Sequence, residues 1–223
     1  MTTENAPTNG SPAERPTNPD SIAPAVLRRT VIIVALLNLA YFFIEATVAW
    51  RIGSVALLAD SVDFLEDTAV NLLIALALGW SLHRRAMMGK VMAGIILLPA
   101  IAALWQAIEK FGDPQPPAVL SLVLTAGGAL VVNSVCAAML ANMRHHGGSM
   151  STAAFLAARN DVYANAAIIL MAGVTALTHS GWPDIILGLA IVLLNGSAAK
   201  EVWEVAEEER LAARALAGEA IDD

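Results

Sequence analysis

The stretch Ser54–Asn71, SVALLADSVDFLEDTAVN, places four acidic residues at the start of an otherwise apolar helix that continues into LLIALALGW. Two of the acids, Asp63 and Asp67, are four residues apart, so they share one face of that helix, about one turn from each other. Carboxylates held so close repel one another unless a cation lies between them. Inside a lipid bilayer such a pair is costly without a partner, and it therefore indicates a functional site.

The composition is that of a membrane protein. Of the 223 residues, 57% are hydrophobic and only 15% are charged, against about 25% charged in a typical soluble domain. Apolar runs over 30–50, 91–108 and 118–140 reach the roughly 18 residues that indicate a membrane-spanning helix. The sequence predicts an all-α membrane protein in a lipid bilayer. It carries no basic stripe with interleaved aromatic residues, which argues against nucleic acid as a partner.

Turns and loops divide residues 27–200 into six expected transmembrane helices. Glycine and proline mark the breaks most clearly at 51–53, 112–117 and 180–183. The expected spans are 30–50, 54–82, 87–108, 118–141, 152–177 and 184–199. Residues 1–26 are polar and rich in Pro, Thr and Asn, which predicts a disordered cytoplasmic tail. Residues 201–223 predict a short helical cytoplasmic tail that extends the last span and frays.

The basic residues set the expected orientation. Seven of them flank one face of the six spans: Arg28, Arg29, Arg84, Arg85, Lys90, Arg144 and Lys200. Only Arg51 and Lys110 flank the other face. Because cytoplasmic loops carry the excess of Lys and Arg, we expect both termini in the cytoplasm.

The expected fifth span carries a second polar pair, Asp161 and Asn165, again four residues apart, with Asn160 beside it. At 1.5 Å per residue, Asp63 and Asp67 lie roughly 14–20 Å below the outer face, and Asp161 about 14 Å above the cytoplasmic face. Both depths are near the middle of a hydrocarbon core about 30 Å thick. Carboxylate and amide oxygens at one depth predict a divalent-cation site. Adhesion between helices through polar side chains is the other interpretation.

Residues 38–67, NLAYFFIEATVAWRIGSVALLADSVDFLED, resemble the first two spans of the cation diffusion facilitator family. Proteins of that family are six-span exporters of zinc and related divalent metals that exchange metal for protons and usually work as dimers. The family's second-span motif, ALLADxxHxxxD or the same with Asp for His, falls on Asp63 and Asp67. Its fifth-span motif falls on Ala157 and Asp161. The resemblance implies Zn2+ as the transported substrate, with Cd2+ or Mn2+ next, a homodimer, and a cell (inner or plasma) membrane location.

Two departures from the family pattern stand out. Ala157 replaces a residue that is a metal ligand in most relatives, which leaves a tetrahedral site one ligand short; Asn160, Asn165 or water would complete it. The family's cytoplasmic C-terminal domain is absent from this sequence, so we expect dimerisation through the spans or the tail.

Several other residues allow two interpretations each. Glu45, in the outer third of the first span, fits a vestibule or proton relay, or else a structural hydrogen bond. Asp60 fits an exit-path acid, or else a solvated acid in the first helical turn. His145 and His146 fit a flexible loop, or else weak metal capture. Cys136, the only cysteine, is expected to be a buried packing residue.

The sequence therefore predicts efflux of a divalent metal cation, zinc first and cadmium second, coupled to proton antiport through a midplane carboxylate site. We do not expect an enzyme: an intramembrane aspartyl protease would carry GxGD on one helix, whereas Asp161 follows Arg-Asn. The alternative function is that of a non-transporting membrane scaffold or metal-sensing protein.

Overall fold

The computed structural model describes residues 24–77, 79–143, 148–195 and 198–216, and within these ranges the regular elements are helices alone. They are α1 (Pro24–Ile52), α2 (Val55–Ala77), α3 (Leu82–Lys110), α4 (Val119–Ala141), α5 (Gly148–Thr178), α6 (Trp182–Asn195) and α7 (Ala198–Leu216). Helices satisfy their backbone hydrogen bonds internally, as hydrocarbon requires. The predicted all-α class is confirmed. Most of the expected N-terminal tail, together with His145 and His146, lies outside the described residues.

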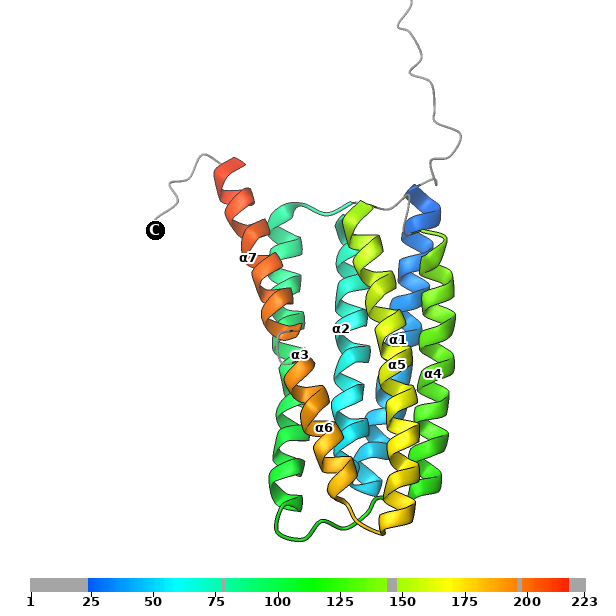
Figure 1. Cartoon of the computed structure of the whole chain (residues 1–223). Helices are drawn as coiled ribbons and strands as arrows, with labels where there is room; N and C mark the ends of the chain where they lie inside the picture. The colour runs from blue at the N-terminus through cyan, green and yellow to red at the C-terminus, as the bar shows by residue number, and fades with distance from the viewer. Residues whose placement is uncertain (1–23, 78, 144–147, 196–197, 217–223) are drawn as a thin grey trace, which may run out of the picture.

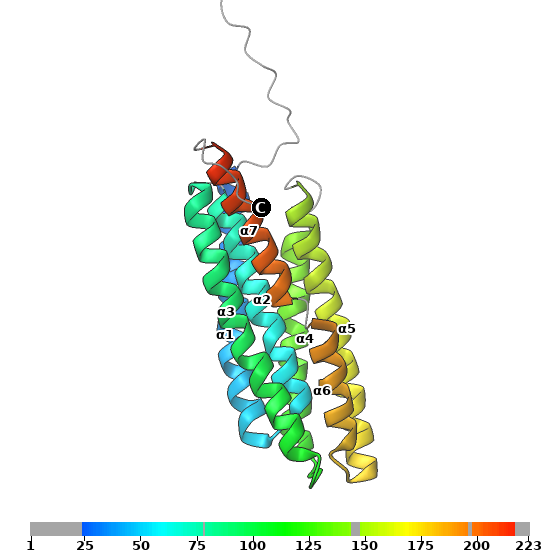
Figure 2. The same ribbon diagram turned by 90° about the vertical axis from the view of Figure 1, so that its left-hand side faces the viewer.

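Helices α1 to α6 stand side by side in a bundle, and α7 continues from α6 along α3 (Figures 1 and 2). Four of the described helices, α1, α3, α4 and α5, are long and apolar enough to cross a membrane by length and composition. The other two expected spans do not meet this criterion of length and apolar composition, for different reasons. α2 has 23 residues but carries the four acids, and α6 has only 14 residues. Neighbouring helices must therefore shield α2 from lipid.

α2 lies in the interior of the bundle. It packs against α1, α3, α5 and α6, and every residue from 54 to 65 is buried. Because no side of the outer half of α2 faces lipid, this helix tolerates its acids. We call the end of the bundle at the α1–α2 turn the outer end, and the opposite end the cytoplasmic end, after the predicted orientation.

Apolar clusters lie on both sides of the polar stretch of α2. The cluster toward the outer end includes Leu57, Leu58, Leu122 and Ile168. The cluster toward the cytoplasmic end includes Val31, Val34, Ile74 and Ala158. Together they place the acids between two apolar regions of the bundle.

The α1–α2 connection is a tight turn. Gly53 has a φ of 67°, a left-handed conformation that costs glycine little because it has no Cβ. The Ser54 N–H donates to the Ala49 carbonyl oxygen at 3.0 Å, and Lys110 Nζ of α3 donates to the Gly53 carbonyl oxygen. The turn is thus tied to the end of α3.

Asp184, in the first turn of α6, caps the start of α2 from across the bundle. Its carboxylate accepts hydrogen bonds from Ser54 Oγ at 2.6 Å and from the Val55 and Ala56 N–H groups at 2.8 and 3.3 Å. Lys110 Nζ lies 3.5 Å from its Oδ2. The buried carboxylate satisfies N–H groups that have no partner within the first helical turn, and it links α2, α3 and α6.

The last expected span and tail differ from the structure. α6 ends at Asn195, and the separate helix α7 covers most of the residues expected to fray. Lys90 of α3 makes an ion pair with Glu207, and its Nζ lies 4.9 Å from the centre of the Trp203 ring. Hydrogen bonds from Arg210 and then Lys90 hold the pKa of Glu207 to about 2. Residues 201–216 are therefore packed on α3 rather than frayed.

Candidate metal site

α2 presents its polar residues as one stripe. Asp60, Asp63, Asp67 and Asn71 follow one another at spacings of three, four and four residues, so their side chains lie on one helix face. Their exposed fractions are 0%, 7%, 3% and 0%. Polar residues of the neighbouring helices meet this stripe in two layers.

The inner layer joins α1, α2 and α4. Asn38 Nδ2 donates to Asp67 Oδ2 at 3.1 Å, and Asn38 Oδ1 accepts from the Cys136 thiol at 3.6 Å. Asn71 Nδ2 donates to the backbone carbonyl of Asp67 at 2.8 Å. Asn38 thus orients the Asp67 carboxylate through one oxygen and leaves the second oxygen for another ligand.

The outer layer joins α1, α2 and α5 nearer the outer end. Asn165 Nδ2 donates to Asp60 Oδ1 at 3.5 Å and to the Asp161 backbone carbonyl at 3.0 Å. Glu45 of α1 is 0% exposed, and its strongest interaction with another charge is with Asp60. On both α1 and α2 the outer residue stands seven positions from the inner one, which is two turns or about 10 Å along the axis.

Asp161 lies on α5 beside the stripe. The charges that act on it are, in descending order, those of Asp67, Asp63 and Asp60, followed by Glu66. Within the described ranges, however, no three or more His, Cys, Asp or Glu side chains are gathered closely enough to hold a metal ion. Asp161 and the α2 acids thus face one another without converging on a common point.

The structure places two sequence-predicted residues differently from expectation. Asp60 is fully buried, so its interpretation as a solvated first-turn acid is wrong. Asn160 is exposed, because one residue rotates it by about 100° from Asp161 around the helix. The helix therefore turns the Asn160 amide away from the cluster, and the Asn165 amide nitrogen is directed to Asp60 rather than to the inner acids.

Asn38 is the functional candidate that sequence reasoning did not single out. The signal was present, since Asn38 and Glu45 are the two polar residues that interrupt the first apolar run. Their separation of seven residues equals that of Asp60 and Asp67. Because α1 and α2 are antiparallel, Asn38 lies beside Asp67 and Glu45 lies beside Asp60.

The α2 acids, Glu45 and Asp161 form a strongly acidic cluster. In the part of the chain that the structure describes, Glu45, Asp60, Asp67 and Asp161 make no ion pair with Lys or Arg. Carboxylates taken out of water need a compensating charge. The arrangement is chemically suited to hold a cation or protons.

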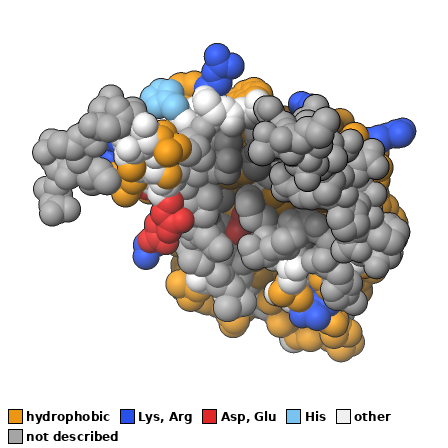
Figure 3. All heavy atoms as spheres, turned by 90° about the horizontal axis from the view of Figure 1, so that it is seen from above, with side chains coloured by type: hydrophobic (Ala, Val, Ile, Leu, Met, Phe, Trp, Pro, Cys, Tyr) orange, Lys and Arg blue, Asp and Glu red, His pale blue; other side chains and the backbone are white. Residues whose placement is uncertain are grey.

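Burial differs among the acids. Figure 3 looks onto the cytoplasmic end and shows acidic surface in a central hollow between the helix ends. Glu66 and Asp161 are partly exposed, whereas Glu45 and Asp60 are completely buried. The outer layer is therefore buried more deeply than Glu66 and Asp161.

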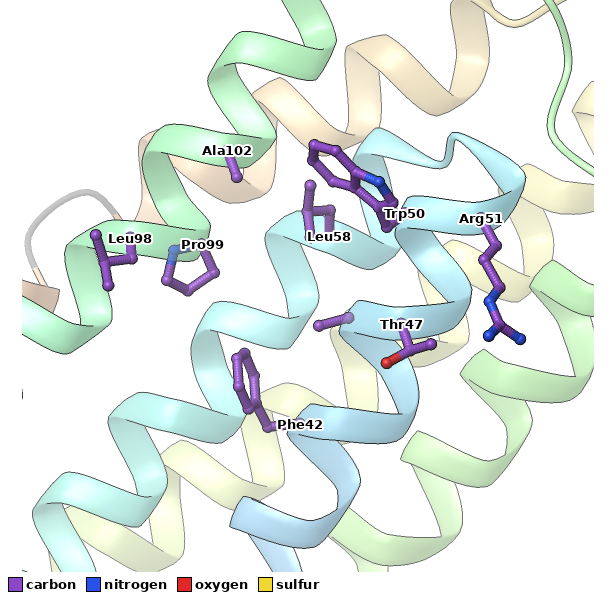
Figure 4. Close-up of a pocket in the computed structure, with 9 residues that line it drawn as sticks. Phe42, Thr47, Trp50, Arg51, Leu58, Leu98, Pro99 and Ala102 are labelled. Atoms are coloured by element: carbon purple, nitrogen blue, oxygen red, sulfur yellow. The ribbon is translucent and has the colours of Figure 1, made fainter.

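A separate groove of about 500 Å³ lies between α1, α2 and α3 (Figure 4). Its lining is mostly apolar and includes Phe42, Trp50, Leu58, Leu98 and Pro99, with Thr47 and Arg51 as polar members. Because no acid lines it, this groove is not the cation site.

Comparison with known proteins shows the family of the chain. A family model, the cation efflux transmembrane domain, matches residues 31–207, which include both polar layers. The chain belongs to the cation efflux family. The resemblance to cation diffusion facilitators inferred from residues 38–67 is thereby confirmed, and this cation efflux protein is a multi-pass protein of the cell membrane.

Two curated proteins are similar to this chain at moderate sequence identity. The zinc transporter ZitB of Yersinia pseudotuberculosis serotype I (strain IP32953) is 25% identical over 193 residues, covering 81% of this chain and 61% of the relative. The zinc transporter ZitB of Escherichia coli (strain K12) is 29% identical over 178 residues, covering 69% and 53%. The chain thus spans between about half and three-fifths of the length of these relatives.

Proposed function

We propose that this cation efflux protein exports a divalent metal ion, zinc first and cadmium second, in exchange for protons. The observation that carries the proposal is the line of buried α2 carboxylates facing Asp161 inside the bundle. Ionisable residues at such depth are retained for ion and proton pathways. The names of the two relatives, both zinc transporters, support zinc as the ion.

Asp63, Asp67 and Asp161 are the proposed ligands. Asn38 orients the Asp67 carboxylate, as partners of metal ligands commonly do. Ala157 offers no ligand, so water completes the coordination shell. An all-oxygen site also admits harder ions such as Mn2+.

Coupling to protons follows from charge. Three carboxylates at the membrane midplane are stable with a divalent ion or with protons, and they are costly when empty and ionised. We propose that metal enters from the cytoplasmic end and reaches Asp161, which is partly exposed. Rocking of the helices then opens the site outward, proton uptake releases the metal, and the protons return inward.

The proposed activity is transport rather than catalysis. The acting unit is proposed to be a homodimer, as the family resemblance implies. Light scattering of the purified protein in detergent tests the dimer through its mass.

Zinc uptake into proteoliposomes tests the function. We expect wild-type uptake, and loss of uptake in Asp63→Asn and in Asp161→Asn. Asp113→Asn makes the same chemical change on an exposed loop and is expected to leave uptake unchanged. Wild-type rates in Asp161→Asn would place the site elsewhere. No uptake of zinc, cadmium or manganese by the wild type would favour the scaffold interpretation.

A further inference from the structure

The outer layer contains more buried acceptors than donors. Four of its oxygens accept no hydrogen bond from an amide or hydroxyl group of the described residues: Glu45 Oε1, Glu45 Oε2, Asp60 Oδ2 and Asn165 Oδ1. The Glu45 and Asp60 carboxyl groups lie within hydrogen-bonding reach of each other. The three side chains come from α1, α2 and α5, and each is 0% exposed. Buried polar groups in proteins are nearly always paired, so acceptor oxygens on three neighbouring helices favour a ligand that donates hydrogen bonds or supplies positive charge.

The hydroxyl groups of Tyr41 and Ser61 are engaged elsewhere. Tyr41, which is close enough for its hydroxyl to interact with the charges of Glu45 and Asp60, donates to the Thr125 carbonyl oxygen at 2.7 Å. Ser61 Oγ donates to the Leu58 carbonyl oxygen at 2.7 Å. The Asn165 amide nitrogen is already shared between Asp60 and a backbone carbonyl. Among the described residues, no Lys, Arg or His side chain pairs with the acids of this layer either.

We propose that Glu45, Asp60 and Asn165 form a second divalent-cation station on the outward side of Asp63, Asp67 and Asp161. The proposal rests on the proposed function, since the station takes the same ion one step farther along its path. Two carboxylates offset the charge of one divalent ion. The oxygens of these carboxylates and of the amide match the hard ligands such an ion accepts.

The position of the station fits an intermediate stop. Along the helices it lies about 10 Å outward of the layer of Asn38 and Asp67, and about 5–6 Å outward of Asp63 and Asp161. The apolar cluster around Leu57, Leu122 and Ile168 closes the bundle on its outer side. An ion that leaves the inner carboxylates is thus held by Glu45 and Asp60 until the outer end opens.

Zinc binding to the full-length protein in detergent tests the proposal. All samples carry His145→Ala and His146→Ala, which removes those histidines as metal ligands. Bound zinc is counted by mass spectrometry after equilibrium dialysis. In a variant with Asp63, Asp67 and Asp161 all changed to Asn, we expect one zinc per chain to remain. Adding Glu45→Gln to the triple variant, or separately Asp60→Asn, is expected to lower its affinity for the remaining zinc at least ten-fold.

The outcomes separate this proposal from the proposed function. If the triple variant binds no zinc while the wild type binds one, the second station is refuted and the proposed inner site stands. If the triple variant binds as much zinc as the wild type, and Glu45→Gln abolishes it, the station stands and the inner site is refuted. A wild type that binds no zinc contradicts both.

Thermal unfolding guards against a folding artefact. Glu45→Gln removes a buried unpaired charge, so its metal-free Tm is expected to equal or exceed that of the parent. Zinc is expected to raise the Tm of the triple variant and to leave it unchanged after Glu45→Gln is added, because a ligand stabilises the folded state it binds. A Tm of the triple variant that responds to pH but not to zinc would mean that the layer takes protons only, which refutes the station.

Discussion

Replacing Asp184 by Asn tests how the outer end of the bundle is held. The near-isosteric amide keeps one acceptor oxygen, so one of the three donors, Ser54 Oγ and the N–H groups of Val55 and Ala56, loses its partner. A buried donor left unpaired costs about 1–3 kcal/mol. Loss of the negative charge at the α2 N-terminus adds about 0.3–2 kcal/mol, and Lys110 loses its buried counter-charge.

The expected loss is therefore about 1–5 kcal/mol. For a chain of this size, 1 kcal/mol corresponds to roughly 2–4 °C in Tm, so we expect Asp184→Asn to melt on the order of 3–20 °C below the wild type. The assay is thermal unfolding in detergent, followed by circular dichroism. Asp113→Asn, on an exposed loop, is the matched control and should stay within about 0.5 kcal/mol of the wild type. If the two variants melt at the same temperature, the capping account is refuted.

Three further predictions follow from single contacts. Asn38→Ala removes the amide that orients Asp67. It should lower the affinity for zinc on the order of 10–100-fold in a competition assay, and unchanged affinity would contradict that role. Gly188→Ala places a Cβ 2.6 Å from the Val55 carbonyl carbon, which should cost about 1–3 kcal/mol in thermal unfolding; an unchanged Tm would show that the two helices can separate freely. The pKa of Glu207 is held to about 2, below the ordinary glutamate value of about 4.3. The α3–α7 contact should therefore persist above pH ~4.3 and weaken as the pH falls toward 2. Spin-label distances between the two helices measure this contact.

The sequence predicted the helical class and the polar stripe because both depend on local spacing. Acids at three- and four-residue intervals necessarily share a face of α2. The depth argument likewise matched α2 with the Asp161 region of α5, because the rise per residue is fixed.

The contacts missed by the sequence depend on how helices far apart in the chain align. Asp184 caps a helix that begins about 130 residues earlier in the chain, and no local pattern specifies that pairing. The burial of Asp60 depends on Asn165 and Glu45 arriving from two other helices. The exposure of Asn160 depends on the rotation of α5 about its axis, which the sequence does not fix because the apolar residues of that helix favour no single face.

Proton-coupled zinc flux tests the central claim most directly. Zinc uptake and internal pH are followed together in proteoliposomes of the wild type, with and without an imposed pH gradient. The account predicts that the gradient accelerates uptake, that each zinc moved is accompanied by protons moving the opposite way, and that Asp161→Asn abolishes both fluxes. Zinc uptake that is indifferent to the gradient and leaves the internal pH unchanged would contradict exchange at the carboxylates between α2 and α5.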